Sequence, residues 1–241
     1  MKLIADTHTH SVASGHAYST VQEMAKGAAD NGIEVFALTD HGPSMLGAPT
    51  IWHFGNLGVI PKVLNGVRIL KGIEVNMIDY RGGLDISDDY LARLEFVIAG
   101  FHDYSINPGT VEEHTAAMIA ALRNPLVDGI VHPGNPQFQI DIDRVVKAAV
   151  EYDKHIEINN HSFVVRTGSE KNCAEIARTA ARLGAKIMTG SDSHISFDIG
   201  KFNNVHRILD EAGIREDQVL NTSVEKIEAC LAARKKRLAG M

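Results

Sequence analysis

Residues 3–32 read LIADTHTHSVASGHAYSTVQEMAKGAADNG and contain one complete strand-and-helix unit. Leu3 to Ala5 is a short apolar run of the kind that forms a buried strand. Thr20 and Glu23 have the Thr-x-x-Glu spacing of a capping box, and the apolar residues that follow recur at helical spacing. Gly32 is placed to end this helix in a left-handed conformation. The stretch therefore predicts a strand followed by a helix.

The same alternation continues along the chain. Including the first, the predicted strands are Leu3 to Ala5, Glu34 to Leu38, Arg68 to Ile73, Phe96 to Ala99, Gly129 to Val131, His155 to Ile158 and Lys186 to Met188. Later helices are expected at Asn56 to Leu64, Glu112 to Arg123, Asp143 to Tyr152, Cys173 to Leu183, Gly200 to Ala212 and Ser223 to Arg237. Strands alternating with helices, with no break in composition, predict one α/β domain over residues 1–241 whose parallel sheet closes into a barrel. A doubly wound open sheet is the alternative, and both folds place function at the carboxyl ends of the strands.

Composition limits the classes of function. A net charge of −6 argues against a broad basic surface for nucleic acid, although divalent ions would reverse the sign locally. The two cysteines, Cys173 and Cys230, lie in predicted helices and do not indicate a disulfide framework. The basic run Arg234 to Arg237 predicts a solvated helix end. No signal peptide or membrane span is indicated, so we expect a cytoplasmic protein without a membrane partner.

Metal-ligand side chains recur just after the predicted strands. Seven of the twelve histidines lie there or in the pair at residues 8 and 10; they are His8, His10, His16, His41, His102, His132 and His194. Glu74 lies in an equivalent place, and Asp192 stands two residues before His194. A single loop histidine is unremarkable, but so many in phase indicate several divalent ions bound at one end of the barrel. Metal-assisted hydrolysis is the chemistry that such a site favours.

Other residues are candidates for supporting roles. Asp6 and Asp40 precede ligand regions and could orient imidazoles from a second layer. Arg166 is a candidate phosphate contact, with an ordinary surface arginine as the alternative. His53 and His161 are candidates for substrate contact, whereas packing or surface roles are expected for the three remaining histidines, His114, His155 and His206. The sequence identifies no side-chain nucleophile and no acid for the leaving group.

The ordered motifs resemble those of the PHP (polymerase and histidinol phosphatase) family. They are Asp6-Thr7-His8-Thr9-His10, Thr39-Asp40-His41-Gly42, Gly72-Ile73-Glu74, His102, His132-Pro133-Gly134 and Gly190-Ser191-Asp192-Ser193-His194. Within the family the chain is most similar to the YcdX-like probable phosphatases, through Ile156-Glu157-Ile158-Asn159-Asn160 and Gly168-Ser169-Glu170-Lys171-Asn172-Cys173.

The resemblance implies a distorted seven-stranded (β/α)7 TIM-like barrel with three divalent ions per chain. Zinc is the expected metal, with manganese or iron as alternatives. By resemblance, His8, His10, Glu74 and Asp192 would hold one ion, and Glu74 would bridge to a second held by His102 and His132. His16, His41 and His194 would hold the third, and the protein would be a homo-oligomer, a trimer by resemblance. The spacing of residues alone indicates only a cluster of several metals.

The predicted reaction is hydrolysis of small phosphate monoesters by a metal-activated hydroxide, with Glu74 and Asp192 acting through that hydroxide. A small phosphorylated substrate is the expected partner. The alternatives are a phosphodiesterase or exonuclease on nucleic acid, a histidinol phosphatase, and a metal-binding regulatory protein without turnover. The acidic chain argues against the nuclease, and the complete ligand set argues against an inert protein.

Overall fold

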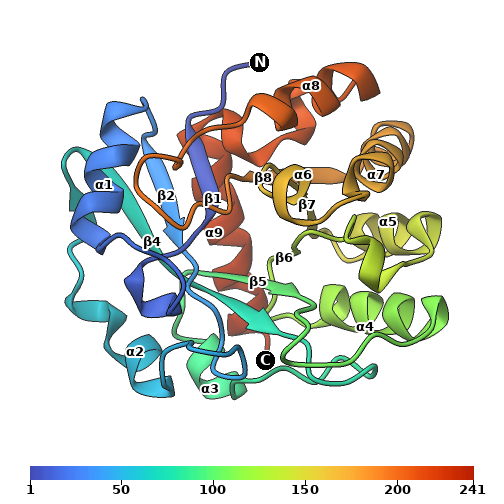
Figure 1. Cartoon of the computed structure of the whole chain (residues 1–241), viewed down its shortest axis with the longest axis horizontal. Helices are drawn as coiled ribbons and strands as arrows, with labels where there is room; N and C mark the ends of the chain where they lie inside the picture. Colours follow the sequence, from blue (N-terminus) through green and yellow to red (C-terminus); the bar gives the residue numbers. More distant parts are fainter.

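Seven parallel strands form a nearly closed barrel in the computed structural model, which describes all 241 residues (Figure 1). In spatial order they are β1 (Ala5–Thr9), β2 (Val35–Leu38), β4 (Val67–Asn76), β5 (Phe96–Gly100), β6 (Gly129–Ile130), β7 (His155–Asn159) and β8 (Lys186–Gly190). A parallel bridge between Thr9 and Ser193 brings the last strand beside the first. The backbone N–H of Asp192 also donates to the carbonyl of His8 at 2.9 Å. The predicted α/β barrel is therefore confirmed.

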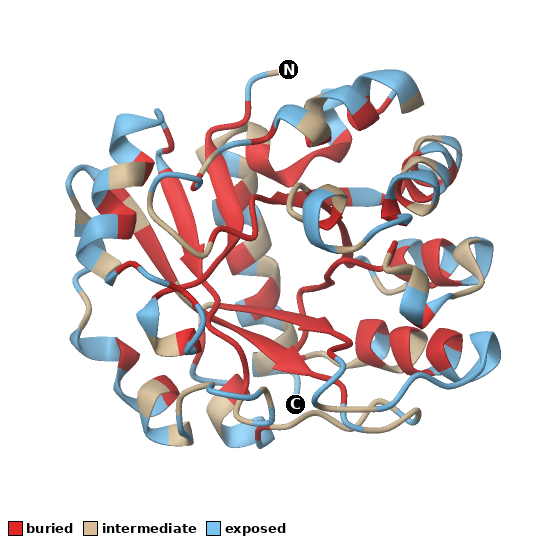
Figure 2. Cartoon of the chain, viewed as in Figure 1, coloured by how far each residue is buried: buried red, intermediate tan, exposed pale blue.

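Helices surround the barrel, and the strands lie buried between them (Figure 2). The helices are α1 (Val21–Asp30), α2 (Ile51–Asn56), α3 (Asp88–Leu91), α4 (Val111–Arg123), α5 (Ile142–Glu151), α6 (Ser162–Val165), α7 (Ser169–Leu183), α8 (Asn203–Ala212) and α9 (Val224–Ala239). The predicted capping box is present, because Thr20 accepts from the Glu23 backbone and Glu23 caps Thr20 in return. No helix has both the length and the apolar character that crossing a membrane requires.

The buried apolar residues form two groups on opposite faces of the strands. The larger group fills the space between the barrel and the outer helices and includes Ile73, Val75 and Ile156. The smaller group includes Leu70, Ile98 and Met188 from the other face, together with Leu220, Ile227 and Leu231 from the C-terminal segment. Because side chains alternate along a strand, this second group fills the barrel interior. α9 closes that interior at the amino ends of the strands.

The helix predicted at Asn56 to Leu64 is wrong. α2 ends at Asn56, a short 3-10 helix spans Leu57–Val59, and Val63–Leu64 (β3) pairs with β4 in an antiparallel hairpin. The two connecting residues, Asn65 and Gly66, have φ angles of 53° and 80°. Asn-Gly is the preferred pair for such a tight turn, and this signal outweighed the helical spacing.

The prediction that Arg234 to Arg237 is a solvated helix end is also wrong for its first residue. Arg234 is buried, and its guanidinium donates to the backbone carbonyls of Leu91, Leu94 and Leu126. It also lies 2.9 Å from the carboxylate of Asp128, which pairs with Arg237 as well. Arg234 thus joins α9 to α3 and to the segments that lead into β5 and β6. These contacts could not be predicted, because most of the partners are backbone carbonyls.

We expect Arg234→Met to lower the free energy of unfolding by about 3–5 kcal/mol, because it breaks a buried ion pair and removes the guanidinium hydrogen bonds to three backbone carbonyls. Urea unfolding followed by circular dichroism measures this change. Lys235→Met, at the exposed neighbouring position, is the matched control and should change stability little. Equal stability of the two variants would show that the buried network does not hold α9.

Candidate metal centre

The interior positions of the strands carry the candidate site. Glu74 follows Leu70 at a separation of four residues on β4, so both side chains face the barrel interior. Two glycines leave room for bulky side chains at this level. A Cβ at Gly190 would lie 2.4 Å from the His8 Cβ, and one at Gly100 would lie 2.7 Å from the His132 ring. The apolar interior therefore gives way to a polar cluster at the carboxyl ends of the strands.

Glu74 lies at the centre of this cluster and is completely buried. Its Oε1 lies 2.7 Å from Nε2 of His132 and 3.1 Å from Nε2 of His102. Its Oε2 lies 2.7 Å from Nδ1 of His41 and 3.3 Å from Nε2 of His8. One carboxylate thus contacts imidazoles that follow or belong to four other strands.

His8, His10 and Asp192 form one side of the cluster. The two imidazole Nε2 atoms lie 3.1 Å apart, as expected for histidines two residues apart in extended chain. Oδ1 of Asp192 lies 3.2 Å from Nε2 of His10 and 3.6 Å from Nε2 of His8. With Glu74, these atoms are the four donors that the resemblance groups around one ion.

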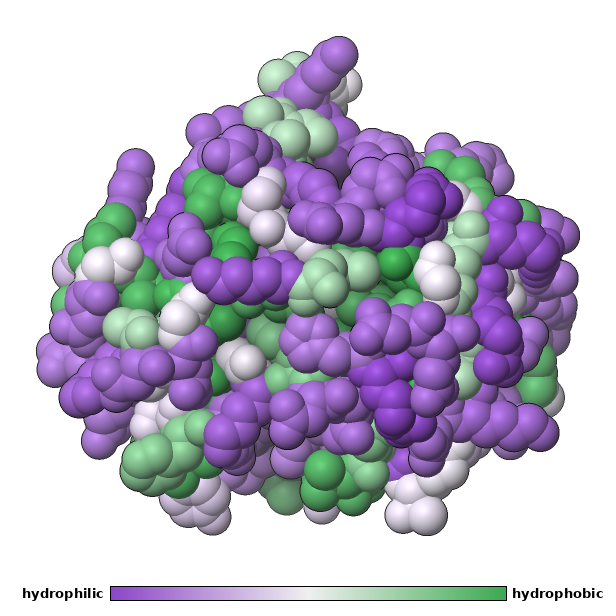
Figure 3. All heavy atoms as spheres, turned by 90° about the horizontal axis from the view of Figure 1, so that it is seen from above, coloured by the Kyte–Doolittle hydropathy of each residue, from purple (hydrophilic) through white to green (hydrophobic).

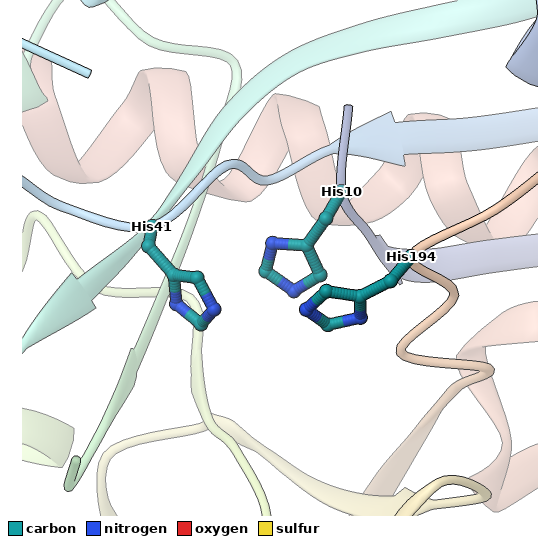
Figure 4. A group of neighbouring side chains, drawn as sticks. All are labelled: His10, His41 and His194. Carbon is teal, nitrogen blue, oxygen red and sulfur yellow. The ribbon is translucent and has the colours of Figure 1, made fainter. Parts of the chain in front are cut away.

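His16 and His194 lie on the outer side of the cluster, His16 exposed and His194 partly exposed, and the buried His41 lies next to them. Nε2 of His16 and Nε2 of His194 are 2.8 Å apart, and the His16 and His41 ring centroids are 5.1 Å apart. His10 stacks between His41 and His194, with 4.3 Å to each ring centroid (Figure 4). The structure therefore brings all nine predicted ligand residues into one cluster.

The donor atoms of this cluster fit divalent ions. Ring nitrogens of His10, His41 and His194 lie within 4.8 Å of one another. Two further groups have ligand atoms equally close together, His8 with His10 and Glu74, and His41 with Glu74 and His102. Nδ1 of His41, Oε2 of Glu74 and Nε2 of His102 are buried, and although they lie near other polar atoms of the cluster, none makes a hydrogen bond with acceptable angles. Ligands at zinc distances in a tetrahedron lie about 3.3 Å apart, which is close to the separations in the cluster. Buried polar atoms need partners, and an ion would supply one to all of them.

The protonation states suit metal binding. Burial opposes a charged carboxylate, yet neighbouring imidazoles, His8 foremost, outweigh it and hold the pKa of Glu74 well below its usual value. Burial lowers the pKa of His132 to about 3, and the guanidinium of Arg166 acts in the same direction. At neutral pH Glu74 is thus an anion and His132 a neutral imidazole, which are the forms that bind metal ions.

Glu157, on the interior face of β7, is a functional candidate that we did not predict individually. Its Oε1 lies 2.7 Å from Nδ1 of His8, and its Oε2 accepts hydrogen bonds from the His132 backbone N–H at 2.7 Å and from Asn159 at 3.1 Å. His132 has a φ of 34°, a left-handed conformation that is uncommon for residues other than glycine. Glu157 therefore holds both the His8 ring and the strained backbone of His132. The sequence pattern that could have identified Glu157 is a single acidic residue between Ile156 and Ile158 in a strand predicted to be buried.

Asp40 makes no direct contact with the histidine rings of the cluster. It accepts hydrogen bonds from the backbone and hydroxyl of Ser11 and from the hydroxyl of Ser14, and its Oδ2 lies 3.1 Å from Nε2 of His53. The Ser14 hydroxyl in turn lies 3.2 Å from Nδ1 of His10. Asp40 can therefore orient the His10 ring only through Ser14.

Asp6 contacts backbone and no imidazole ring. It accepts from the N–H groups of Ser191 at 3.0 Å and Gly200 at 2.8 Å, and more weakly from that of His8 at 3.4 Å. Its carboxylate holds the loop after β8 against β1. Asp6 therefore positions the backbone of the site and does not orient an imidazole ring directly.

A cavity of about 370 Å³ opens onto the outer side of the cluster. His161 and Arg166 line it together with His16, His41, His102, Asp192 and His194. Nη1 of Arg166 lies 3.3 Å from Oδ2 of Asp192, so this guanidinium stands beside the cluster rather than on the open surface. The other three histidines lie elsewhere: His114 and His155 are buried in packing positions, and His206 lies on α8.

Comparisons with known proteins agree with this fold. A family model described as "PHP domain" matches residues 6–161. A protein named "Probable phosphatase" from Acetivibrio thermocellus is 60% identical over 238 residues, covering 99% of both chains. Another so named, from a Thermoanaerobacter species, is 51% identical over the whole chain and 99% of its own length. The solved histidinol phosphate phosphatase of Lactococcus lactis, 16% identical, superposes with a TM-score of 0.59 over 88% of this chain and 94% of its own.

Proposed function

This chain belongs to the PHP domain family, and from that premise we propose that it is a metal-dependent phosphatase that hydrolyses small phosphate monoesters. One observation carries the proposal. Glu74 and eight other imidazole and carboxylate side chains form one cluster beside a cavity that Arg166 also lines. The relatives named as probable phosphatases and the zinc, L-histidinol and phosphate in the Lactococcus structure support the same reading.

The proposed centre would hold three divalent ions, with zinc as the expected metal and manganese or iron as alternatives. His8, His10, Glu74 and Asp192 would hold one ion, Glu74, His102 and His132 a second, and His16, His41 and His194 the third. Such ions would supply an activated water as nucleophile and neutralise the charge of the phosphate.

The protein's own residues have separate tasks in this proposal. Glu74 and Asp192 would offset the charge of the ions, while Glu157 would accept a hydrogen bond from the Nδ1–H of His8 and so leave its Nε2 free to bind a metal. Arg166 can donate hydrogen bonds to a phosphate oxygen from the wall of the cavity, beside the ions. Together they give an acidic chain a local site for an anion.

Release of inorganic phosphate tests this function. We expect metal-loaded protein to hydrolyse small monoesters, including L-histidinol phosphate in the panel, and to leave oligonucleotides intact. A chelator should abolish turnover, and added zinc or manganese should restore it, because the site depends on its ions. Cleavage of oligonucleotides without release of phosphate from monoesters would instead support the nuclease alternative. Full metal occupancy without turnover of either class would support a binding protein.

A further inference from the structure

A second and larger cavity, of about 550 Å³, adjoins the metal centre. It shares Met45, His102, Val165 and Arg166 with the smaller cavity beside the histidine rings. A phosphate held at the ions would therefore have its ester oxygen next to this larger space. The volume lies in the range of cavities that bury a whole small molecule rather than a phosphate alone.

The walls of the larger cavity are fixed by a buried histidine. Nε2 of His114 accepts a hydrogen bond from the Gly109 backbone N–H at 2.8 Å, and its Nδ1 donates to the Gln139 carbonyl at 2.9 Å. Below it, the Phe101 and Phe138 rings stack with centroids 4.9 Å apart. The loops after β5 and β6 are thus joined to each other, so the cavity is formed before any ligand arrives.

The charge of the lining indicates an uncharged occupant. Apart from the ligand His102, the charged residues in the wall are Arg166 and Asp103, which have opposite signs. A second phosphate or a carboxylate would need a further cation, because anions in proteins are held by several charge-assisted hydrogen bonds. A cationic group would be attracted by Asp103 but repelled by Arg166. The lining therefore favours neither a positively nor a negatively charged occupant.

The remaining lining offers a flat apolar surface and amide groups. Tyr104 is 67% exposed and borders the cavity, with Phe101 and Pro136 nearby. The Asn135 side-chain oxygen accepts from the Gln137 backbone N–H, so its NH2 group remains for a ligand, and the Gln137 side chain has no partner within the protein. Aromatic rings stack on planar bases, and asparagine and glutamine amides match the donor and acceptor edges of such bases.

We propose that this cavity binds the leaving group of the substrate and that this group is a nucleoside, which makes nucleoside monophosphates the substrate class. Tyr104 stacks on the base, and Asn135 and Gln137 contact its polar edge. Arg166 lines both cavities and so lies between the nucleoside and the phosphate. The assignment of the substrate class rests on the proposed phosphatase function; the assignment of the cavity as a nucleoside site does not.

Two measurements on metal-loaded protein test the proposal. In steady-state kinetics, kcat/KM for adenosine 5′-monophosphate should exceed that for ethyl phosphate by roughly tenfold or more, because base stacking adds binding energy. It should also exceed kcat/KM for glucose 6-phosphate, whose leaving group has no planar ring, and for adenosine 3′,5′-bisphosphate, whose second phosphate finds no cation. In titration calorimetry, adenosine itself should bind.

Tyr104→Ala and Gln137→Ala should reduce adenosine binding, and they should lower kcat/KM for adenosine 5′-monophosphate more than kcat/KM for ethyl phosphate, so that the ratio of the two moves toward unity. Gln22→Ala, an exposed glutamine on α1 outside the cavity, is the matched control and should alter neither. No adenosine binding, equal kcat/KM for the nucleotide and ethyl phosphate, or equal losses for both esters in the variants would overturn the proposal. Adenosine binding without hydrolysis of any monoester would refute the phosphatase and leave the nucleoside site standing.

Discussion

Replacing Glu74 by glutamine should nearly abolish phosphate release, lowering kcat by more than about a hundredfold, and should remove about one ion or more per chain. The substitution keeps the size of the side chain and removes its charge. Both oxygens of Glu74 face imidazoles that offer nitrogens to the same space. An amide has one oxygen and no charge, so it cannot bridge two cations in this position.

Metal analysis of the purified variant, together with phosphate-release kinetics, measures this effect. Glu34→Gln, an exposed acid before β2 at the opposite end of the barrel, is the matched control and should retain its metal and turnover. If Glu74→Gln kept the metal content and the rate of the unmodified protein, Glu74 would not be a ligand and the proposed centre would be wrong.

Glu157→Gln should weaken metal binding by about tenfold to a hundredfold although Glu157 is not itself a proposed ligand. The carboxylate of Glu157 accepts hydrogen bonds on both oxygens, from His8 on one and from the His132 backbone and Asn159 on the other. A glutamine must turn its NH2 group toward one of these sets. If the NH2 group faced His132 and Asn159, it would meet two other hydrogen-bond donors. We therefore expect the NH2 group to donate to Nδ1 of His8. The His8 ring proton would then lie on Nε2, which could no longer bind a metal.

Burial opposes a charged His8 ring, but the carboxylates of Glu157, Glu74 and Asp192 raise its pKa well above the usual value. Nitrogen NMR at a pH high enough to neutralise this ring therefore distinguishes the two His8 tautomers in the metal-free protein, and competition with a chelating dye gives the metal affinity. A role in folding alone would lower the melting temperature without changing the tautomer. Glu151→Gln, exposed at the end of α5, serves as the control. An unchanged His8 tautomer together with unchanged affinity would remove Glu157 from the positioning of the site.

The strands and the positions of the nine candidate ligand residues at the strand ends could be predicted because each depends on local pattern. Apolar runs such as Phe96 to Ala99 must be buried, and a histidine or acid at the end of such a run stands out against them. β1 was placed too early, at Leu3 to Ala5, because the strand in fact runs through Asp6 to Thr9. Those polar residues are buried by partners far along the chain, such as Ser191 and Thr189, which no local window contains.

The second layer of the site could not be predicted in the same way. Glu157 acquires its role from contacts with His8, which lies 149 residues away, and with His132. Asp40 was identified as an orienting group, but its route through Ser14 depends on how the loop after β1 folds back. Arg234 looked like a solvated charge because its partners are backbone carbonyls, which every residue has.

Anomalous diffraction from a crystal of the metal-loaded protein shows whether these nine side chains hold three metal ions. With data collected on the high-energy side of the zinc absorption edge, we expect three strong peaks inside the cluster. One should lie among His8, His10, Glu74 and Asp192, one between Glu74 and the rings of His102 and His132, and one among His16, His41 and His194. Peaks only outside this cluster, or none in protein that metal analysis shows to be loaded, would contradict the proposed centre.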